Sequence, residues 1–100
     1  MVKLTVLYKH PTDPAAFESY YAATHMPLVG KIQGILKAEV TKFLPEADGS
    51  NPAFYRMAEL YFENPEALQE SMGSAEGQAT AGDLANFATG GFTILSGVVG

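Results

Sequence analysis

The segment YYAATHMPL, residues 20–28, contains the groups of this sequence that are best suited to proton transfer. His25 is one of only 2 histidines among 100 residues, and a histidine side chain changes its charge near neutral pH, which suits a general acid or base. Tyr21 lies four residues earlier, on the same side of a helix. A hydroxyl of Tyr21 or Tyr20 could donate a hydrogen bond to a developing enolate or phenolate oxygen. His25, Tyr21 and Tyr20 are therefore the candidate catalytic residues.

Each of these residues also has a structural interpretation that the sequence leaves open. A histidine in the last turn of a helix can hydrogen-bond the free carbonyl groups there. Tyr20 and Tyr21 project about 100° apart on a helix, so one of them can pack in the core while the other points into a cleft. His10, the second histidine, precedes Pro11 in a predicted loop, and we expect it to be exposed.

Other parts of the chain provide candidate ligand contacts. Asp83 and Phe87 lie four residues apart on a predicted helix with Asn86 between them, so these three could line the mouth of a pocket. Tyr8 and Tyr61, in predicted strands, complete the candidate substrate-binding set.

Two carboxylates fall among charged neighbours on one predicted sheet face. Glu39 and Glu59 could move protons if a partner subunit buried them, because burial raises the pKa of a carboxyl group. Lys3 and Lys37 lie on the same face, and pairing with these lysines is the preferred interpretation.

The composition argues against several other kinds of site and partner. The chain has no cysteine, which excludes disulfides, thiol catalysis and cysteine-bound zinc or iron–sulfur centres. No H-E-x-x-H, G-x-G-x-x-G or G-K-[ST] pattern is present, so we expect neither a metal nor a cofactor. A net charge of −5 without a basic run disfavours nucleic acid and anionic membranes as partners. No apolar run approaches the ~20 residues of a membrane span and no signal peptide is evident, so we expect a soluble cytoplasmic protein.

Hydrophobic periodicity predicts the elements that position these residues. The expected strands are residues 2–8, 35–44, 54–63 and 92–99. The expected helices are residues 14–25, 65–72 and 74–87. Asp13-Pro14 and Asn64-Pro65 combine an N-cap with a proline in the first turn, and Pro27 is expected to end or kink the first helix at Met26. The order β-α-β-β-α-β is that of the ferredoxin-like α+β fold.

The strand register divides the predicted sheet into two unlike faces. The apolar face, expected under the helices, comprises Val2, Leu4, Val6, Leu36, Ala38, Val40, Ala58, Leu60, Phe62, Ile94 and Val98. The mixed face comprises Lys3, Thr5, Leu7, Lys37, Glu39, Thr41, Phe43, Tyr55, Met57, Glu59, Tyr61, Thr93 and Leu95. The large apolar groups of the mixed face would form a patch typical of an interface or ligand groove, so we expect a second subunit to cover it in a homodimer. The alternative is an amphipathic sheet that faces water.

Three segments resemble the EthD domain family, named for a protein of ethyl tert-butyl ether degradation. LTVLYKHPTDPAAFESYYAATHMPL, residues 4–28, has the strand, the DP-x-x-F helix start, the tyrosine pair and the H-x-P-L ending. IQGILKAEV, residues 32–40, has a glycine before the next strand, and SAEGQATAGDLANFATGG, residues 74–91, has the S-x-E-G and D-L-x-N-F patterns. The resemblance implies one domain over residues 1–100 that forms a dimeric α+β barrel.

The resemblance implies less about chemistry. Relatives in the wider superfamily include cofactor-free isomerases, dehydratases and monooxygenases, and some members carry the label EthD family reductase. It thus implies a small cofactor-independent enzyme that acts on a hydrophobic carbonyl- or phenol-type metabolite, as an isomerase, a dehydratase or an oxidoreductase, with His25 as acid or base. The alternatives are a non-catalytic protein that binds such a molecule or supports an oxygenase system, and a bare dimerisation module.

Overall fold

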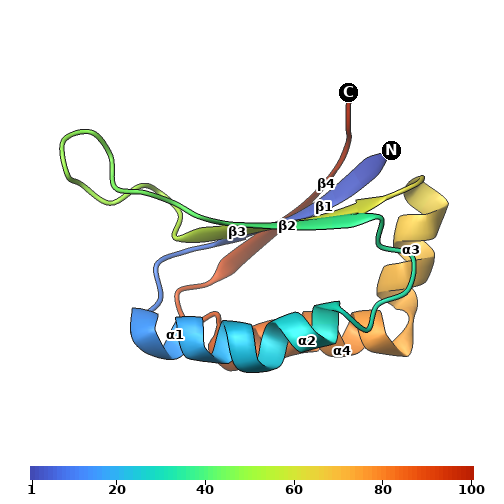
Figure 1. Cartoon of the computed structure of the whole chain (residues 1–100), viewed down its shortest axis with the longest axis horizontal. Coiled ribbons are helices and arrows are strands. Elements are labelled where there is room, and N and C mark those ends of the chain that lie inside the picture. Colours follow the sequence, from blue (N-terminus) through green and yellow to red (C-terminus); the bar gives the residue numbers. More distant parts are fainter.

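The computed structural model describes residues 1–100 as a four-stranded antiparallel sheet with its helices on one face (Figure 1). The strands are β1 (Val2–Tyr8), β2 (Lys37–Lys42), β3 (Arg56–Phe62) and β4 (Phe92–Val98). Their order across the sheet is β2-β3-β1-β4, so β1 and β3 are central and β2 and β4 are edges. The predicted α+β, ferredoxin-like order of elements is confirmed. None of the helices has the length and apolar composition of a membrane span.

The helices begin where the sequence signals predicted. They are α1 (Pro14–Tyr20), the π-helical turn η1 (Tyr21–His25), α2 (Met26–Val29), α3 (Pro65–Gly73) and α4 (Ala75–Phe87). Asp13, Asn64 and Ser74 are the N-caps of α1, α3 and α4, and their side-chain oxygens accept hydrogen bonds from backbone N–H groups at 3.2, 2.8 and 3.1 Å. Each cap satisfies one of the amides that a helix start leaves free.

The first helical segment does not end at Met26, because a π-helical turn lets it continue past Pro27. The Met26 N–H bonds the carbonyl group of Tyr21, five residues earlier. In a regular α-helix the ring of Pro27 would collide with the carbonyl group four residues earlier, and the wider turn relieves that collision. The chain stays helical to Val29, and the Gly30 N–H then bonds the Met26 carbonyl at 3.1 Å.

The core lies between the two central strands and the helical layer. Its buried members alternate along β1 and β3, as the register predicted, and meet aromatic rings from α1, η1 and α4. The ring centroid of Phe17 lies 5.4 Å from those of Tyr8 and Tyr21 and 5.2 Å from that of Phe87. These aromatic contacts join the helical layer to the centre of the sheet.

The helices cover less of the sheet than the apolar pattern predicted. Several residues expected beneath the helices are substantially exposed: Leu36 (56%), Val40 (46%), Ile94 (43%) and Val98 (82%). They belong to the two edge strands or flank them, whereas the buried residues of the sheet belong to β1 and β3. The helical layer is narrower than the sheet, so it covers the two central strands but not the edges.

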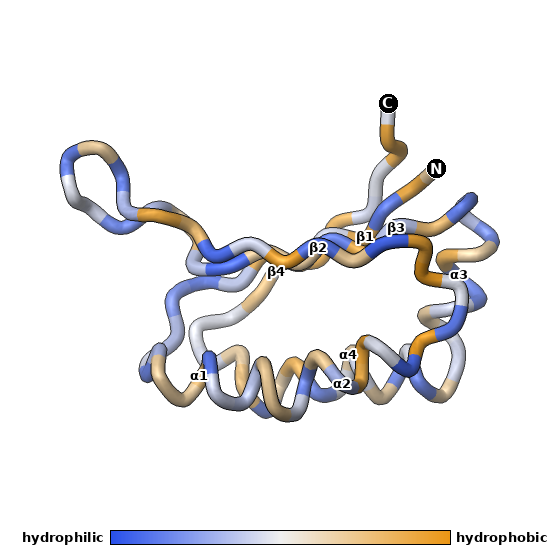
Figure 2. The backbone as a smooth tube through the Cα atoms, in the orientation of Figure 1, coloured by the Kyte–Doolittle hydropathy of each residue, from blue (hydrophilic) through white to orange (hydrophobic).

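The loop between β2 and β3 projects from a body whose overall extents are 41 × 30 × 17 Å (Figure 1). Hydrophobic segments lie on its stem and near the C-terminus (Figure 2). Leu44, at the start of the loop, is 82% exposed. Tyr55, at its end, was expected on the mixed face, but its ring packs 5.2 Å from that of Phe17 in α1. Tyr55 precedes β3, so the alternation of the strand does not fix its direction.

Candidate active site

His25 is buried and hydrogen-bonded to Asp83 of α4. His25 Nδ1 lies 2.9 Å from Asp83 Oδ2, and the two residues are 4% and 7% exposed. An ionised carboxylate can only accept hydrogen bonds, so Nδ1 carries the proton and donates it. When a ring with this tautomer is neutral, its free lone pair is on Nε2. A carboxylate that fixes one tautomer of a histidine in this way is a familiar feature of general-base sites.

Two more donors hold the Asp83 carboxylate in place. The Tyr20 hydroxyl donates to Oδ1 at 2.6 Å, and the Asn86 side-chain amide donates to the same oxygen at 2.9 Å. Burial would raise the pKa of Asp83, but the hydrogen bonds from Tyr20, Asn86 and His25 outweigh it and hold this pKa below the ordinary value. The hydrogen bond to Asp83 in turn raises the pKa of Tyr20, which keeps this phenol protonated. Asp83 is therefore a carboxylate at neutral pH.

The π-helical turn η1 brings Tyr20 and His25 to the same carboxylate. Two residues five apart in a regular α-helix point about 140° away from each other. Here Tyr20 and His25 bond the two oxygens of Asp83, because the wider turn of residues 21–25 changes the phase of the helix between them. Single π-turns inside α-helices are frequent at functional sites.

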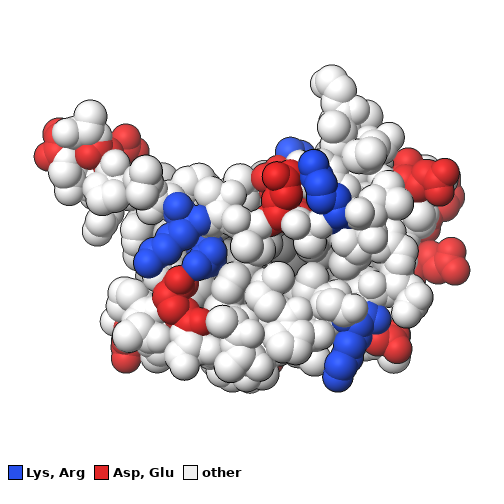
Figure 3. All heavy atoms as spheres, viewed as in Figure 1, with Lys and Arg blue, Asp and Glu red and all other residues white.

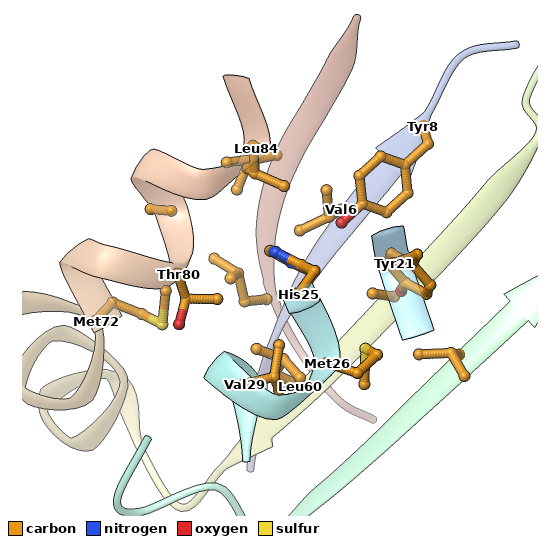
Figure 4. A pocket seen from close by; sticks show the side chains of 15 residues that line it. Val6, Tyr8, Tyr21, His25, Met26, Val29, Leu60, Met72, Thr80 and Leu84 are labelled. Carbon is orange, nitrogen blue, oxygen red and sulfur yellow. The ribbon is translucent and has the colours of Figure 1, made fainter. Parts of the chain in front are cut away.

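An apolar cavity of about 40 Å³ lies beside His25, between the sheet and the helical layer (Figure 4). Hydrophobic residues make up 13 of the 15 that line it, and none of the 15 is Lys, Arg, Asp or Glu. Its polar groups are His25, Thr80 and the hydroxyls of Tyr8 and Tyr21. Figure 4 shows Tyr8 projecting from β1 toward the space that His25 faces from the helical layer. Figure 3 shows this face of the molecule hollowed between sheet and helices, with charged groups around the hollow.

Burial keeps the two cavity tyrosines protonated. Burial, and then the nearby Tyr21 hydroxyl, raise the pKa of Tyr8 far above its ordinary value. Burial also raises the pKa of Tyr21, although the Arg56 guanidinium, 5.0 Å from the centroid of its ring, opposes this. The Tyr21 hydroxyl is buried and has no hydrogen-bond partner in the chain. Both phenols can therefore donate to a ligand oxygen, and neither can act as a base at neutral pH.

The structure brings most of the candidate residues from the sequence together. The hydrogen-bonded network comprises His25, Tyr20, Asp83 and Asn86. The ring of Phe87 lies 4.6 Å from that of His25, and Tyr8 and Tyr21 line the cavity. Asp83 and Asn86 were expected to contact substrate, whereas here they bond each other and the residues around them. The pairing of Asp83 with His25 was not anticipated, since the two residues are 58 positions apart and no local pattern links them.

Tyr61 lies apart from this group, on the opposite face of the sheet. Lys37 Nζ sits 4.7 Å from its ring centroid, and the preferred pairing of Glu39 and Glu59 with lysines is confirmed on the same face. Lys3 Nζ lies 2.6 Å from a Glu59 oxygen, and Lys37 Nζ lies 3.4 Å from a Glu39 oxygen.

The second histidine and the acidic residues form no further centre. His10 is exposed, as expected, and its Nε2 lies 2.7 Å from the Pro52 carbonyl oxygen, where it helps to hold the projecting loop. No group of three or more His, Cys, Asp or Glu side chains is placed to share a metal ion.

The fold resembles those of proteins with diverse descriptions. A dimeric protein of unknown function from Bacteroides fragilis superposes with a TM-score of 0.67 at 20% identity, covering 98% of this chain and 95% of its own. A hydroxynitrile lyase from Passiflora edulis superposes with a TM-score of 0.76 at 15% identity, covering 99% of this chain and 93% of its own. At these identities the likeness shows the ferredoxin-like fold alone.

Closer relatives agree on the family. An uncharacterized 11.0 kDa protein of Rhodococcus erythropolis is 42% identical over 95 residues, which are 95% of this chain and 91% of that protein. The crystal structure of an EthD family protein from Bacillus halodurans is 38% identical, has a TM-score of 0.92 and covers 99% of this chain and 98% of its own. The EthD domain matches residues 9–91. This chain therefore belongs to the EthD domain family.

Proposed function

We propose that this protein catalyses proton transfer on a small, uncharged, hydrophobic carbonyl or phenol compound bound in the cavity. The observation that carries the proposal is the buried His25–Asp83 pair at the wall of an apolar cavity. Asp83 fixes the proton on Nδ1, which leaves Nε2 of His25 free to take or give a proton.

The chemistry needs only groups that the site contains. Nε2 of His25 takes a proton from the carbon next to a carbonyl group, and the electron pair of the C–H bond forms the enolate. The carbonyl oxygen gains negative charge, and a hydroxyl of Tyr8 or Tyr21 donates a hydrogen bond to it. Asp83 stabilises the imidazolium that forms. Return of the proton, to the same carbon or to another atom of the enolate, restores His25, and no electrons leave the substrate.

The lining of the cavity favours an uncharged substrate. No Lys or Arg lines it, and the Arg56 guanidinium is engaged by Glu18, with its Nη2 2.6 Å from Glu18 Oε1. A carboxylate ligand would be buried without a cation to pair with, which carries a large desolvation penalty. A volume of about 40 Å³, against the ~10–15 Å³ that one water molecule requires, limits the buried part of the ligand to a few atoms.

Binding without conversion is the second candidate function. The observation that favours it is the nearly uniform hydrophobic lining, since such cavities also occur in proteins that only hold a ligand. The hydroxynitrile lyase from Passiflora edulis supports the catalytic alternative, because it shows that this fold can house an enzyme.

The experiment is deuterium exchange. Cyclohexanone, acetophenone and phenol are incubated with the protein in D₂O at neutral pH, and NMR follows both the binding shifts and the loss of the proton next to the carbonyl group of the two ketones. We expect exchange above the buffer rate for at least one ketone, and a fall to the buffer rate in His25→Gln, whose amide cannot take the proton. His10→Gln is the matched control and should exchange like the natural protein.

The result that contradicts catalysis is exchange that persists in folded His25→Gln, or ketone binding with no exchange at all. Binding without exchange would support the second candidate. Benzoate, which matches acetophenone in size but carries a charge, should not shift the resonances of the cavity residues. Benzoate binding as tight as that of acetophenone would contradict the proposed selection for uncharged ligands.

A homodimer through the outer face of the sheet completes the proposal. The helices all lie on the other face (Figure 1), and Leu95 on the outer face is 54% exposed. Half-buried apolar groups such as Leu7 and Met57 accompany it. A second copy would remove these groups from water, and the similar protein from Bacteroides fragilis is described as dimeric.

A further inference from the structure

We propose that Tyr20 and Asn86 are positioning residues that keep His25 a neutral base. Their hydrogen bonds stabilise the Asp83 carboxylate, so the carboxylate does not need a positively charged imidazole, with a second proton on Nε2, beside it. The role of these residues in turnover rests on the proposed proton-transfer function. Their effect on the charge of His25 does not, and it can be measured without any substrate.

The two oxygens of Asp83 accept hydrogen bonds from different partners. Tyr20 and Asn86 both donate to Oδ1, at 2.6 and 2.9 Å, and His25 donates to Oδ2 at 2.9 Å. A buried carboxylate whose only partner was His25 would favour the imidazolium strongly, because an unpaired buried charge is costly. With three donors the hydrogen-bond needs of the carboxylate are met even when the imidazole ring is neutral.

Tyr20 and Asn86 act from outside the cavity. Neither lines the apolar cavity, and both border a separate surface hollow between α1 and the end of α4. The ring of Tyr20 stacks on that of Phe87 at a centroid distance of 5.4 Å, which fixes the direction of its hydroxyl. A ligand in the cavity is therefore reached by His25 and not by these two residues. This placement separates their role from substrate contact, which the sequence had suggested for Asn86.

Few other titratable groups face His25. Asp83 of α4 is its direct partner, and Tyr8 of β1 and Tyr21 of η1 are neutral phenols beside it. Arg56 of β3 stands behind the Tyr21 ring, and Glu18 neutralises it. The charge of the carboxylate, as its donors set it, is therefore the main electrostatic influence on the imidazole.

The test is an NMR titration of the ring nitrogens of His25 in Tyr20→Phe, in Asn86→Ala and in the double variant. Removal of the donors makes the Asp83 carboxylate more basic, so the His25–Asp83 pair should bind its proton about tenfold more tightly in the double variant. His25 should then stay charged to a pH about one higher, with smaller shifts in the single variants. Tyr55→Phe, which removes a buried hydroxyl without a partner, and Gln69→Ala on an exposed helix position are the matched controls.

The two proposals fail in different ways. If the folded variants lose stability but His25 titrates at the same pH as in the natural protein, Tyr20 and Asn86 are merely structural and the inference is overturned. Asn86 is exposed, so Asn86→Ala keeps the test open if Tyr20→Phe does not fold. If the titration moves as expected while no ketone exchanges in the natural protein, the inference stands and the proposed catalysis does not.

Discussion

Replacement of Asp83 by alanine should destabilise the protein more than any other loss of a single acidic side chain. The substitution leaves the buried His25 Nδ1–H without an acceptor and removes the partner of the Tyr20 hydroxyl and the Asn86 amide. Hydrogen bonds to an ionised group contribute about 1.5–3 kcal/mol each, but they are not additive, and removal of a buried charge recovers part of its desolvation penalty. We expect a net loss of about 2–4 kcal/mol in the free energy of unfolding.

The assay is urea denaturation at fixed protein concentration, with thermal unfolding beside it. For a chain of this length, each kcal/mol corresponds to about 4–8 °C, so the midpoint should fall by at least ~8 °C. The loss should depend on pH in a definite direction. The pKa of Asp83 is lower in the folded protein than its ordinary value of 3.8, so the carboxylate contributes its stability in full above that value and loses it as the pH falls through the folded pKa.

The difference between the natural protein and Asp83→Ala should therefore shrink as the solution becomes more acidic than the ordinary Asp pKa of 3.8. Asp48→Ala is the control, because Asp48 has a lowered pKa in an exposed turn and should change stability little. If Asp83→Ala is as stable at pH 7 as the Asp48→Ala control, then the hydrogen bonds to the ionised Asp83 do not stabilise the protein as described.

Three further predictions concern other contacts. Glu18→Gln should lose less than about 1 kcal/mol of stability, because the pair with Arg56 is partly exposed. Urea midpoints should show this loss at pH 7, and the loss should fade as the pH falls through the folded pKa of Glu18, which Arg56 holds below the ordinary value of 4.5. Gly77→Ala should destabilise the protein, because the added Cβ would lie 2.7 Å from a backbone atom of α3. Gly82 is in the same helix but faces open space, so Gly82→Ala should stabilise the protein by about 0.5–1 kcal/mol, as measured by thermal unfolding. Leu95→Glu should dissociate the proposed homodimer in sedimentation experiments.

Each of these predictions has a result that would contradict it. A Glu18→Gln effect that does not shrink as the solution becomes strongly acidic would rule out the ion pair as its cause. Equal effects of alanine at the two glycines would show that the contact between α3 and α4 is not as close as described. Leu36→Glu places the same charge at a sheet edge, and a dimer lost equally in both leucine variants would not support the outer face as the interface.

The sequence by itself determined the helices and strands and the face of the sheet on which the helices pack. N-caps at Asp13 and Asn64 and the alternation of Val2, Leu4 and Val6 are local signals, since each depends on hydrogen bonds or burial within a few residues. The family resemblance likewise follows from short motifs. His25, Tyr20 and Tyr21 could be chosen as candidates because the types and spacing of reactive residues are visible in one segment.

Only the tertiary structure decided how these residues act. The pairing of His25 with Asp83 joins segments that are 58 residues apart, and it depends on how α4 packs beside η1. The helix continues past Pro27 through the π-turn that also aligns Tyr20 with His25, whereas the proline had predicted an end or kink at Met26. Tyr61 and Tyr8 were both candidate ligand contacts, yet they lie on opposite faces of the sheet. Partnership between distant side chains is set by the packing of helices on the sheet, and no local pattern contains that information.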